Sequence, residues 1–437
     1  MKITLIGGGS STFTPQLLQL FIASPALRGA TISLMDIDEH RLGVMTTLSR
    51  LLIEKTGADL RIESTTDRRT ALAGAAFVIT AISVGGFDAW ERDIEIPATY
   101  GIYMPIADSI GPGGIMRAFR HVPVLADVAR DVAELAPDAW IFNYTNPLTA
   151  NCIAMRRVAP TVKTVGLCTC SSIPRVPLYL AWYANIEPEE LVLPAPAGGL
   201  NHCAAILALR LRDGRDAFPV LRERVTEPVT RWVLETYGIL PYCWSHWTEF
   251  YPSLSRLEEP YQGRLQGLRM HYGITVHDMA HERERARHWE DLASRFAEGS
   301  AELSVDVLPK DETVQVVQII EALVAGANEV HVVNVPNRGA IPNLPAEAIV
   351  EVSSLVGAYG IQPLQVGPLP EPVAAILRQH ITAQELTVEA ALKGDRKLAL
   401  QAFLQDPRIA AALTPQEAGK LLDEMLRAHA PYLPQFA

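Results

Sequence analysis

Two residues of the types that bind transition metals stand in separate segments of the chain, the thiol of Cys168 and the imidazole of His202. Sulfur and nitrogen ligands suit a divalent transition metal, and two ligands from separate loops leave coordination positions open for a substrate. Each residue taken alone also has an ordinary structural explanation, a buried thiol at a strand end for Cys168 and a core histidine for His202. Cys170 follows closely, but one Cys-x-Cys pair without a second pair is weak support for zinc. The remaining cysteines are expected to be packing residues: Cys152, Cys203 and Cys243.

A second chemical signal is a run of glycines near the start of the chain, Gly7-Gly8-Gly9, followed by Ser10 and Ser11. Glycines after a first strand let the backbone approach a pyrophosphate, and the following helix offers free N–H groups and a positive dipole end. The run departs from the strict G-x-G-x-x-G pattern because Thr12 stands at the third glycine position. The pattern therefore favours dinucleotide binding. The alternative is a plain glycine turn in a flavodoxin-like sheet.

Asp36 strengthens the dinucleotide interpretation. It stands at the end of the second expected strand, where a carboxylate can accept hydrogen bonds from the ribose hydroxyls of an adenosine. The same charge would repel a 2′-phosphate. NAD is therefore favoured over NADP.

These residues need a sheet of parallel strands to position them. In the first third of the chain, apolar runs that we interpret as strands alternate with helical segments: Ile3–Ile6, Thr31–Met35, Phe77–Ser83 and Trp140–Tyr144. This alternation predicts an α/β protein with an N-terminal Rossmann-like, doubly wound sheet. From about Val165, strand-like runs between long helical stretches predict a second, α+β domain. We expect an NAD-binding domain at 1–165, a substrate, metal and oligomerisation domain at 166–437, and a ligand site in the cleft between them.

Composition excludes several classes of protein. The 437 residues are 49% apolar and 20% charged, which suits a large folded core. The net charge of −11 argues against a partner that is nucleic acid or an anionic membrane, because both need a basic face. The start of the chain reads as a strand rather than a signal peptide, and the longest uncharged run contains prolines and glycines. We therefore expect a soluble, cytoplasmic protein.

Several motifs occur in order along most of the chain: Gly7–Ser11, Leu34–Asp38, Gly111–Gly114 with Arg117–Arg120, Asn143–Pro147, Gly166–Cys168, Gly199–His202, and Asn334–Asn337 with Gly339. None of them is decisive alone. As an ordered set they resemble glycoside hydrolase family 4, the glycosidases that depend on NAD and a divalent metal.

The resemblance implies an unusual route for cleaving a glycosidic bond, an exception to the usual pair of carboxylates. NAD takes hydride from C3 of the sugar, and a metal held against O2 and O3 stabilises the enediolate that forms when a base removes the C2 proton. The aglycone leaves from C1, water adds to the alkene, and NADH returns the hydride. The implied cofactors are NAD and Mn²⁺ or another divalent metal, and the implied partner is a small-molecule glycoside.

The resemblance also assigns roles to individual residues. Cys168 and His202 match the family's protein ligands for the metal. Asn146 matches an asparagine that reaches substrate hydroxyls, although it could instead cap the helix that opens at Pro147. Asp108 and Asn201 are expected on the substrate side, where Asp108 either orients a hydroxyl or metal-bound water or only ties down its loop.

Two positions depart from the family pattern. The arginine that grips phosphate in the 6-phospho-sugar branch, located by its distance from Pro97, is replaced here by Trp90, with Arg92 nearby. A tryptophan cannot pair with a phosphate, so a 6-phosphate substrate is disfavoured. Trp90 could stack on a sugar ring or simply pack. The residue after the metal cysteine is Thr169, whose hydroxyl is a poor general acid.

The region from Gly238 to Pro252 resembles the uronide-cleaving branch, which recognises a carboxylate at C5. An anionic group needs cationic or N–H donors, and the sequence leaves several candidates open: Arg92, Arg117 and Arg120. The base that removes the C2 proton is expected to be Tyr251 or His246, with Tyr242 as a further phenol. A phenol needs its charge stabilised to act near neutrality.

The sequence therefore predicts a glycosidase for an unphosphorylated or acidic hexoside. Within the family the alternative is a 6-phospho-α- or β-glucosidase. From other classes, an NAD-dependent 2-hydroxyacid dehydrogenase and a non-catalytic NAD-binding protein remain open. Relatives commonly form dimers or tetramers, so a homodimer or homotetramer is expected.

Overall fold

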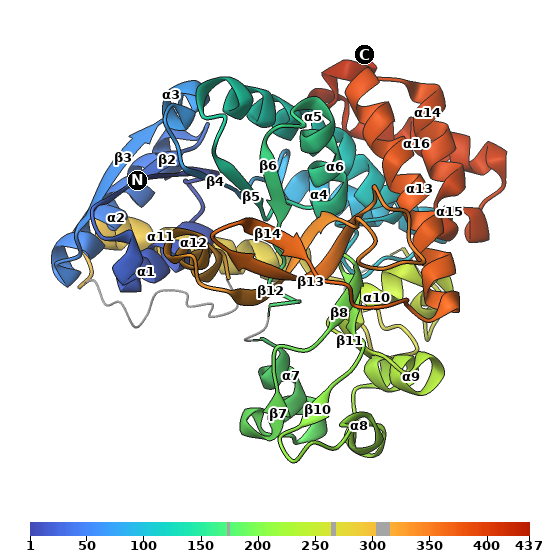
Figure 1. Cartoon of the computed structure of the whole chain (residues 1–437). Helices are drawn as coiled ribbons and strands as arrows, with labels where there is room; N and C mark the ends of the chain where they lie inside the picture. Colours follow the sequence, from blue (N-terminus) through green and yellow to red (C-terminus); the bar gives the residue numbers. More distant parts are fainter. Residues whose placement is uncertain (173–174, 264–267, 303–314) are drawn as a thin grey trace.

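Parallel strands form one half of a large sheet in the computed structural model, which describes residues 1–172, 175–263, 268–302 and 315–437 (Figure 1). Across the sheet these strands are β3 (Leu60–Thr65), β2 (Ala30–Met35), β1 (Lys2–Ile6), β4 (Phe77–Thr80), β5 (Trp140–Asn143) and β6 (Lys163–Gly166). The order 3-2-1-4-5-6 is that of doubly wound dinucleotide-binding sheets. The predicted α/β class with a Rossmann-like N-terminal sheet is therefore confirmed.

Helices cover both faces of the parallel strands. On one face α1 (Phe13–Ala23), α2 (Glu39–Thr56), α11 (Met279–Ala297) and α12 (Val316–Ala325) pack together. On the other face α3 (Arg68–Leu72), α5 (Gly111–Leu135), α6 (Leu148–Val158) and α13 (Glu371–Lys393) do the same. The strands between them are buried on both sides, as a doubly wound sheet requires.

The sheet continues beyond the parallel strands with antiparallel neighbours. They are β12 (Glu329–Pro336), β13 (Ile349–Gly357), β8 (Ala197–Leu200), β9 (Cys203–Ile206) and β11 (Leu240–Pro241), with β14 (Gly360–Pro363) beside β13. β12 joins the two halves because Asn334 pairs with Gly166 of β6. The expected boundary at residue 165 falls inside β6, and the sheet continues from β6 to β12. The division of the chain into two domains at this point stays a prediction.

Two further groups of elements flank the sheet (Figure 1). A small lobe, seen below the sheet, holds α7 (Arg175–Ala184), β7 (Leu191–Val192), β10 (Arg210–Leu211) and α8 (Phe218–Arg224). Next to this lobe, α9 (Pro228–Tyr237) contacts α8 and β11, and α10 (Trp244–Phe250) contacts α9 and β9. At the C-terminal end α13 is joined by α14 (Arg396–Gln405), α15 (Pro407–Ala412) and α16 (Pro415–Ala428). Among the described helices, including α4 (Gly86–Thr99), none has the length and apolar character needed to cross a membrane.

Candidate active site

A cavity of about 930 Å³ lies where the chain order of the parallel strands reverses, beside β1 and β4. Open α/β sheets bind their ligands at this switch point, beyond the carboxyl ends of the strands. Trp90 and Arg117 line this cavity, and so do all but Gly8 of the residues predicted to bind a dinucleotide: Gly7, Gly9, Ser10, Ser11 and Asp36. Its size and lining suit an extended ligand such as a dinucleotide.

The glycine run is required by close contacts on two sides. Gly7 has a φ of 99°, and a Cβ there would stand 2.2 Å from the carbonyl oxygen of Ala81. The Gly9 N–H donates to Asp36 Oδ2 at 2.9 Å, and a Cβ on Gly9 would stand 2.8 Å from the same oxygen. Ser10 Oγ accepts from the N–H of Phe13, the first residue of α1. The loop is therefore held against Asp36 at the edge of the cavity.

A cluster of polar side chains lies in a second region, built from segments far apart in the sequence. Asp108 Oδ1 stands 3.4 Å from His202 Nδ1, and Ser109 Oγ lies 2.8 Å from each of these two atoms. Asp108 Oδ2 accepts from Asn146 Nδ2 at 2.7 Å and stands 3.8 Å from His246 Nε2. The rings of His202 and His246 stack with centroids 3.7 Å apart. The structure thus brings together four residues that the sequence singled out separately.

Cys168 belongs to the same cluster. It follows β6 and is buried, and it interacts with His202 on one side and Cys170 on the other. Cys170 and then His202 hold the pKa of the Cys168 thiol well below its ordinary value, against the opposing effect of burial. A thiolate is the form that binds a metal.

The charges of the cluster depend on one another. Burial would raise the pKa of Asp108, but the imidazoles of His202 and then His246 hold it well below the usual range. Burial would lower the pKa of His202, but Asp108 and Cys168 raise it well above the usual value. The pair of anions is thus balanced by a proton on His202. A divalent cation can replace that proton, because its ligands must be an imidazole in the neutral form and a thiolate.

The donor set fits the metal that the resemblance implies. A thiolate and an imidazole lie side by side, and a carboxylate and an amide stand within reach of the same space. Asn201 is buried, and its Oδ1 has no hydrogen-bond partner among the described residues. Such a site has soft protein ligands on one side and polar groups for a sugar on the other.

Glycines and a buried glutamate position Asp108. A Cβ on Gly114, in the first turn of α5, would stand 2.4 Å from the carbonyl carbon of Ser109, so this helix can pack so closely only because the residue is glycine. Ala107 adopts a φ of 58°, and Glu249 Oε1 accepts from its N–H at 2.8 Å. His202 itself has a φ of 69° in the turn between β8 and β9. Left-handed backbone at non-glycine residues is often found where geometry serves a function.

Glu351 is a residue that the sequence reasoning missed. It lies in the centre of β13, is 1% exposed, and its Oε1 accepts from Ser171 Oγ and Asn334 Nδ2 and contacts Asn201 Nδ2 at 3.5 Å. Burial, and then the negative charge of Cys168, raise the pKa of Glu351 to about 8. The available signal was a lone glutamate inside an apolar strand, since an unpaired buried carboxyl is rare.

The two residues expected to supply the C2 base occupy different surroundings. His246 has both ring nitrogens engaged, Nδ1 with Cys243 Sγ at 2.8 Å and Nε2 toward Asp108. Burial lowers its pKa, but Cys243 and Asp108 raise it overall to about 10. Tyr251 is buried, its ring packs on Trp247, and burial raises the pKa of its phenol. Which of the two acts as the base stays a prediction.

The three candidate arginines differ in what they already bind. Arg120 is buried and forms two hydrogen bonds with Asp93, at 2.9 and 2.6 Å. Arg92 is exposed and donates to a backbone carbonyl of α16. Arg117 lines the cavity, lies 5.3 Å above the ring of Trp90, and has no described partner for its Nε and Nη1. Of the three, Arg117 is the one that lines the cavity, and it has donors left for an anionic ligand.

Family models and known relatives match most of this chain. The family model described as family 4 glycosyl hydrolase matches residues 2–173, and that for the C-terminal domain of the same family matches residues 197–409. An α-galactosidase of Bacillus subtilis is 31% identical over 100% of this chain and 99% of its own length. An α-glucosidase of Erwinia rhapontici is 33% identical over 93% of both chains. An α-galacturonidase of Lachnoclostridium phytofermentans is 28% identical over 100% of this chain and 97% of its own.

Solved structures share the fold. The Bacillus subtilis protein lplD has a TM-score of 0.83 and 27% identity, covering 98% of this chain and 99% of its own. A 6-phospho-α-glucosidase from gut microorganisms, solved in complex with NAD and Mn²⁺, has a TM-score of 0.83 and 22% identity over 99% of both chains. At that identity the second structure supports the fold alone.

Proposed function

The chain belongs to family 4 of the glycosyl hydrolases, and we propose that it cleaves an unphosphorylated or acidic hexoside with NAD and a divalent metal, Mn²⁺ foremost. The observation that carries the proposal is the meeting of Cys168, His202 and Asp108 in one buried cluster, in a chain that also presents a dinucleotide-sized cavity bordered by Asp36. The activities of the relatives and the NAD and Mn²⁺ bound by a structural neighbour support the choice.

The residues divide the work of binding. When bound, NAD would accept hydride from C3 of the sugar, and the metal would stabilise the charge that develops when the C2 proton leaves. Cys168 and His202 would hold the metal. Asp108 and Asn146, which are already hydrogen-bonded to each other, would orient sugar hydroxyls, with Asn201 as a further donor or acceptor. Asp36 would receive the adenosine ribose.

For the C2 base we propose Tyr251 rather than His246. Both nitrogens of His246 face existing partners, Cys243 and Asp108, whereas the Tyr251 hydroxyl lies beside a neutral phenol, that of Tyr237. The phenol becomes a useful base once a neighbouring cation stabilises its anion. Tyr251→Phe removes the hydroxyl and keeps the ring against Trp247. We expect it to stop exchange of the C2 hydrogen with deuterated solvent while NAD binding persists.

The surroundings of Trp90 and Arg117 favour a carboxylate over a 6-phosphate. Trp90 Nε1 donates to the carbonyl of Ile106 at 2.6 Å, so its indole is fixed and carries no charge for a phosphate. Arg117 keeps Nε and Nη1 without described partners, so its guanidinium has N–H donors left for an anionic group such as a carboxylate. We propose that Arg117 binds the acidic group of a uronide.

Two experiments test the function. The first measures hydrolysis of aryl α- and β-hexosides, uronides and 6-phospho-hexosides with NAD, Mn²⁺ and a reductant, and we expect the 6-phospho-hexosides to be the poorest substrates. The second removes all pyridine nucleotide from the enzyme, which should abolish hydrolysis. Undiminished hydrolysis without nucleotide would refute the proposal, and accumulation of NADH during turnover would support the dehydrogenase alternative.

Arg117 has its own test. Replacing it by methionine removes a charge-assisted hydrogen bond worth about 1.5–3 kcal/mol, so kcat/KM for a uronide should fall by roughly 10- to 100-fold relative to that for the neutral hexoside. Equal losses for both substrates would exclude a role in recognising the carboxylate. We also propose that the enzyme is a cytoplasmic homodimer or homotetramer. Light scattering of the purified protein tests the oligomeric state.

A further inference from the structure

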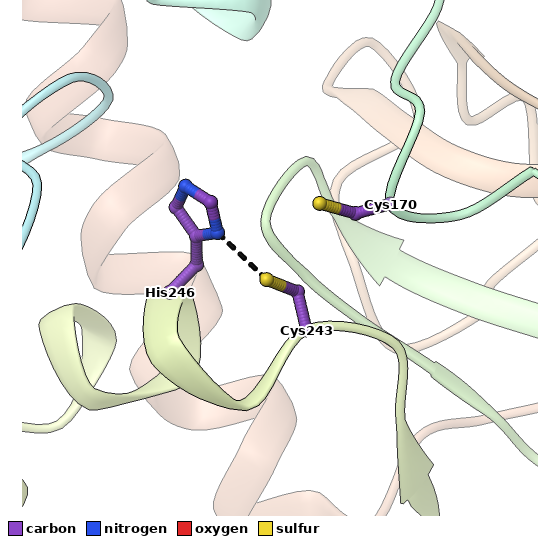
Figure 2. A group of neighbouring side chains, drawn as sticks. All are labelled: Cys170, Cys243 and His246. Carbon is purple, nitrogen blue, oxygen red and sulfur yellow. Dashed lines mark hydrogen bonds between the residues drawn. The ribbon is translucent and has the colours of Figure 1, made fainter. Parts of the chain in front are cut away.

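A second group of metal-binding side chains adjoins the cluster described above. Figure 2 shows Cys170, Cys243 and His246 converging from two sides on one small space. One ligand atom from each residue lies within 4.8 Å of the others, and Cys243 Sγ stands 2.8 Å from His246 Nδ1. Cys243 was expected to be a packing residue. The structure instead places its sulfur against an imidazole nitrogen.

We propose that Cys170, Cys243 and His246 form a separate site for a thiophilic cation, Zn²⁺, distinct from the site at Cys168 and His202. Two sulfurs and one nitrogen are soft ligands that Mn²⁺ disfavours and that zinc prefers. Three protein ligands leave the fourth tetrahedral position for water or a further ligand.

The spacing of the atoms is close to that of a zinc site. With bonds of about 2.3 Å to sulfur and 2.0 Å to nitrogen, tetrahedral angles place two sulfurs about 3.8 Å apart and a sulfur and a nitrogen about 3.6 Å apart. The contact between Cys243 Sγ and His246 Nδ1 is 2.8 Å, so binding needs it to open by less than about 1 Å. Cys243 and His246 stand at the N-cap and in the first turn of α10, which fixes their separation.

The second site would also order the first. His246 has its Nδ1 toward Cys243 and its Nε2 toward Asp108 Oδ2, 3.8 Å away. A cation on Nδ1 leaves the proton on Nε2, where it points at Asp108. His246 would then be a fixed hydrogen-bond donor at the edge of the substrate cluster. Its cation would hold the Cys170 loop against α10.

A disulfide between Cys170 and Cys243 is the main alternative. It requires the sulfurs to approach to about 2.05 Å and makes no use of an imidazole. The contact between His246 and Cys243 therefore favours a cation. One site shared by both groups is also disfavoured, since Asp108, His202 and His246 form their own group of ligand atoms, with His246 Nε2 rather than Nδ1 toward Asp108.

Metal content of the full-length protein tests the proposal. The protein is purified with reductant, incubated with Zn²⁺ and Mn²⁺ together, desalted, and analysed by mass spectrometry for both elements. We expect zinc to be retained by wild-type protein and by Cys168→Ser. Cys243→Ser and Cys170→Ser should weaken zinc binding by more than about 100-fold, while Mn²⁺ binding and NAD binding persist. Cys152→Ala, a buried cysteine in α6 outside both clusters, is the matched control and should retain zinc.

Cobalt supplies a readout that does not depend on activity. Co²⁺ in place of zinc should give thiolate-to-metal absorption and the intense visible bands of a tetrahedral site in wild-type protein and in Cys168→Ser, and Cys243→Ser should lose both. Failure of reduced wild-type protein to retain zinc would overturn the proposal. So would loss of Mn²⁺ together with zinc in Cys243→Ser, because that result means one shared site. A Cys170–Cys243 disulfide that persists in reductant would overturn it as well.

Discussion

The cavity proposed to bind NAD, here called the nucleotide cavity, and the cluster proposed to bind the metal, here called the metal cluster, are built in opposite ways. The glycine loop from Gly7 to Ser11 is one stretch of chain that lines the cavity, and Asp36 at the end of the next strand holds it by accepting from the Gly9 N–H. The metal cluster collects side chains from separate segments: Asp108, Asn146, Cys168, His202 and His246. The first region depends on local conformation, and the second depends on the packing of the whole chain.

The two regions also differ in charge. The glycine loop is neutral, so a change there alters how closely a ligand can approach. In the cluster each ionised group sets the pKa of its neighbours, as Asp108 and His202 show. Groups coupled in this way act as a unit, and removing one should affect all of them. Substitutions in the cluster should therefore cost most of the activity, whereas those in the nucleotide cavity should give graded losses of affinity.

The largest effects should follow from removing a proposed metal ligand. Cys168→Ser and His202→Ala each leave the cation with one protein ligand of that pair, and we expect hydrolysis to fall by at least roughly 1000-fold, since even outer groups around a metal change activity by about 10- to 100-fold. NAD affinity, measured by calorimetry, should stay unchanged because neither residue lines the nucleotide cavity.

Cys152→Ala serves here too as the control cysteine, and it should keep its activity. Full hydrolysis by Cys168→Ser or His202→Ala in buffer treated with a chelator would contradict the metal role. A parallel loss of NAD binding would contradict the separation of the two regions.

A smaller loss is expected from Asp108→Asn. This change removes the anion that balances His202 and His246, and we expect kcat/KM to fall by roughly 100-fold, since outer groups around a metal change activity by about 10- to 100-fold. The amide keeps the shape of the carboxylate and its contact with Ser109. Ser109→Ala removes a neutral partner of Asp108 and His202, and it should lower kcat/KM less than Asp108→Asn does. The reverse order would show that the hydroxyl, and not the charge, organises the cluster.

Asp36 provides the matching test in the nucleotide cavity. Asp36→Ala removes hydrogen bonds from a carboxylate to the ribose, worth about 1.5–3 kcal/mol, so NAD affinity should fall by roughly 10- to 100-fold. The preference for NAD over NADP should shrink as well, because the charge that repels a 2′-phosphate is gone. Asp36→Asn keeps an acceptor for the Gly9 N–H and should lose less NAD affinity than Asp36→Ala. Equal affinities of wild type and Asp36→Ala for NAD would refute the ribose contact.

The same contrast explains which features could be predicted from the sequence. The strand expected at Thr31–Met35 is β2, Ala30–Met35, and the glycine loop and Asp36 line one cavity, because neighbouring residues determine these features. For the cluster, the residue types alone left ordinary structural explanations open for Cys168 and His202, and the family resemblance was needed to single them out. Their encounter with Asp108 depends on contacts between distant segments, which no local pattern encodes.

The residues that escaped prediction are those whose chemistry is hidden by burial. Glu351 stands in an apolar strand, and Cys243 looked like a core thiol until the fold placed His246 beside it. Glu249 holds the backbone of Ala107 from a helix distant in sequence. In each case the signal is a polar group with a buried partner. That partner becomes known only when the sheet and α10 are assembled.

The smallest expected effect concerns the pH dependence of stability and tests Glu351, which links the two halves of the sheet through Asn334 of β12. In metal-free protein, burial and Cys168 raise the pKa of Glu351 from 4.5 to about 8, so the folded state binds its proton more tightly than the unfolded chain. This contribution to stability is fully present below pH 4.5 and is lost as the pH rises through about 8.

Glu351→Gln carries no titrating proton and can still accept the hydrogen bonds of Ser171 and Asn334. Its melting temperature should therefore fall less than that of wild type across this window, by a few degrees, while the exposed Glu284→Gln on α11 should follow wild type. Identical slopes of melting temperature against pH for Glu351→Gln and wild type would show that Glu351 keeps the same charge in the folded and unfolded chain. The charge of Cys168 would then not raise the pKa of Glu351.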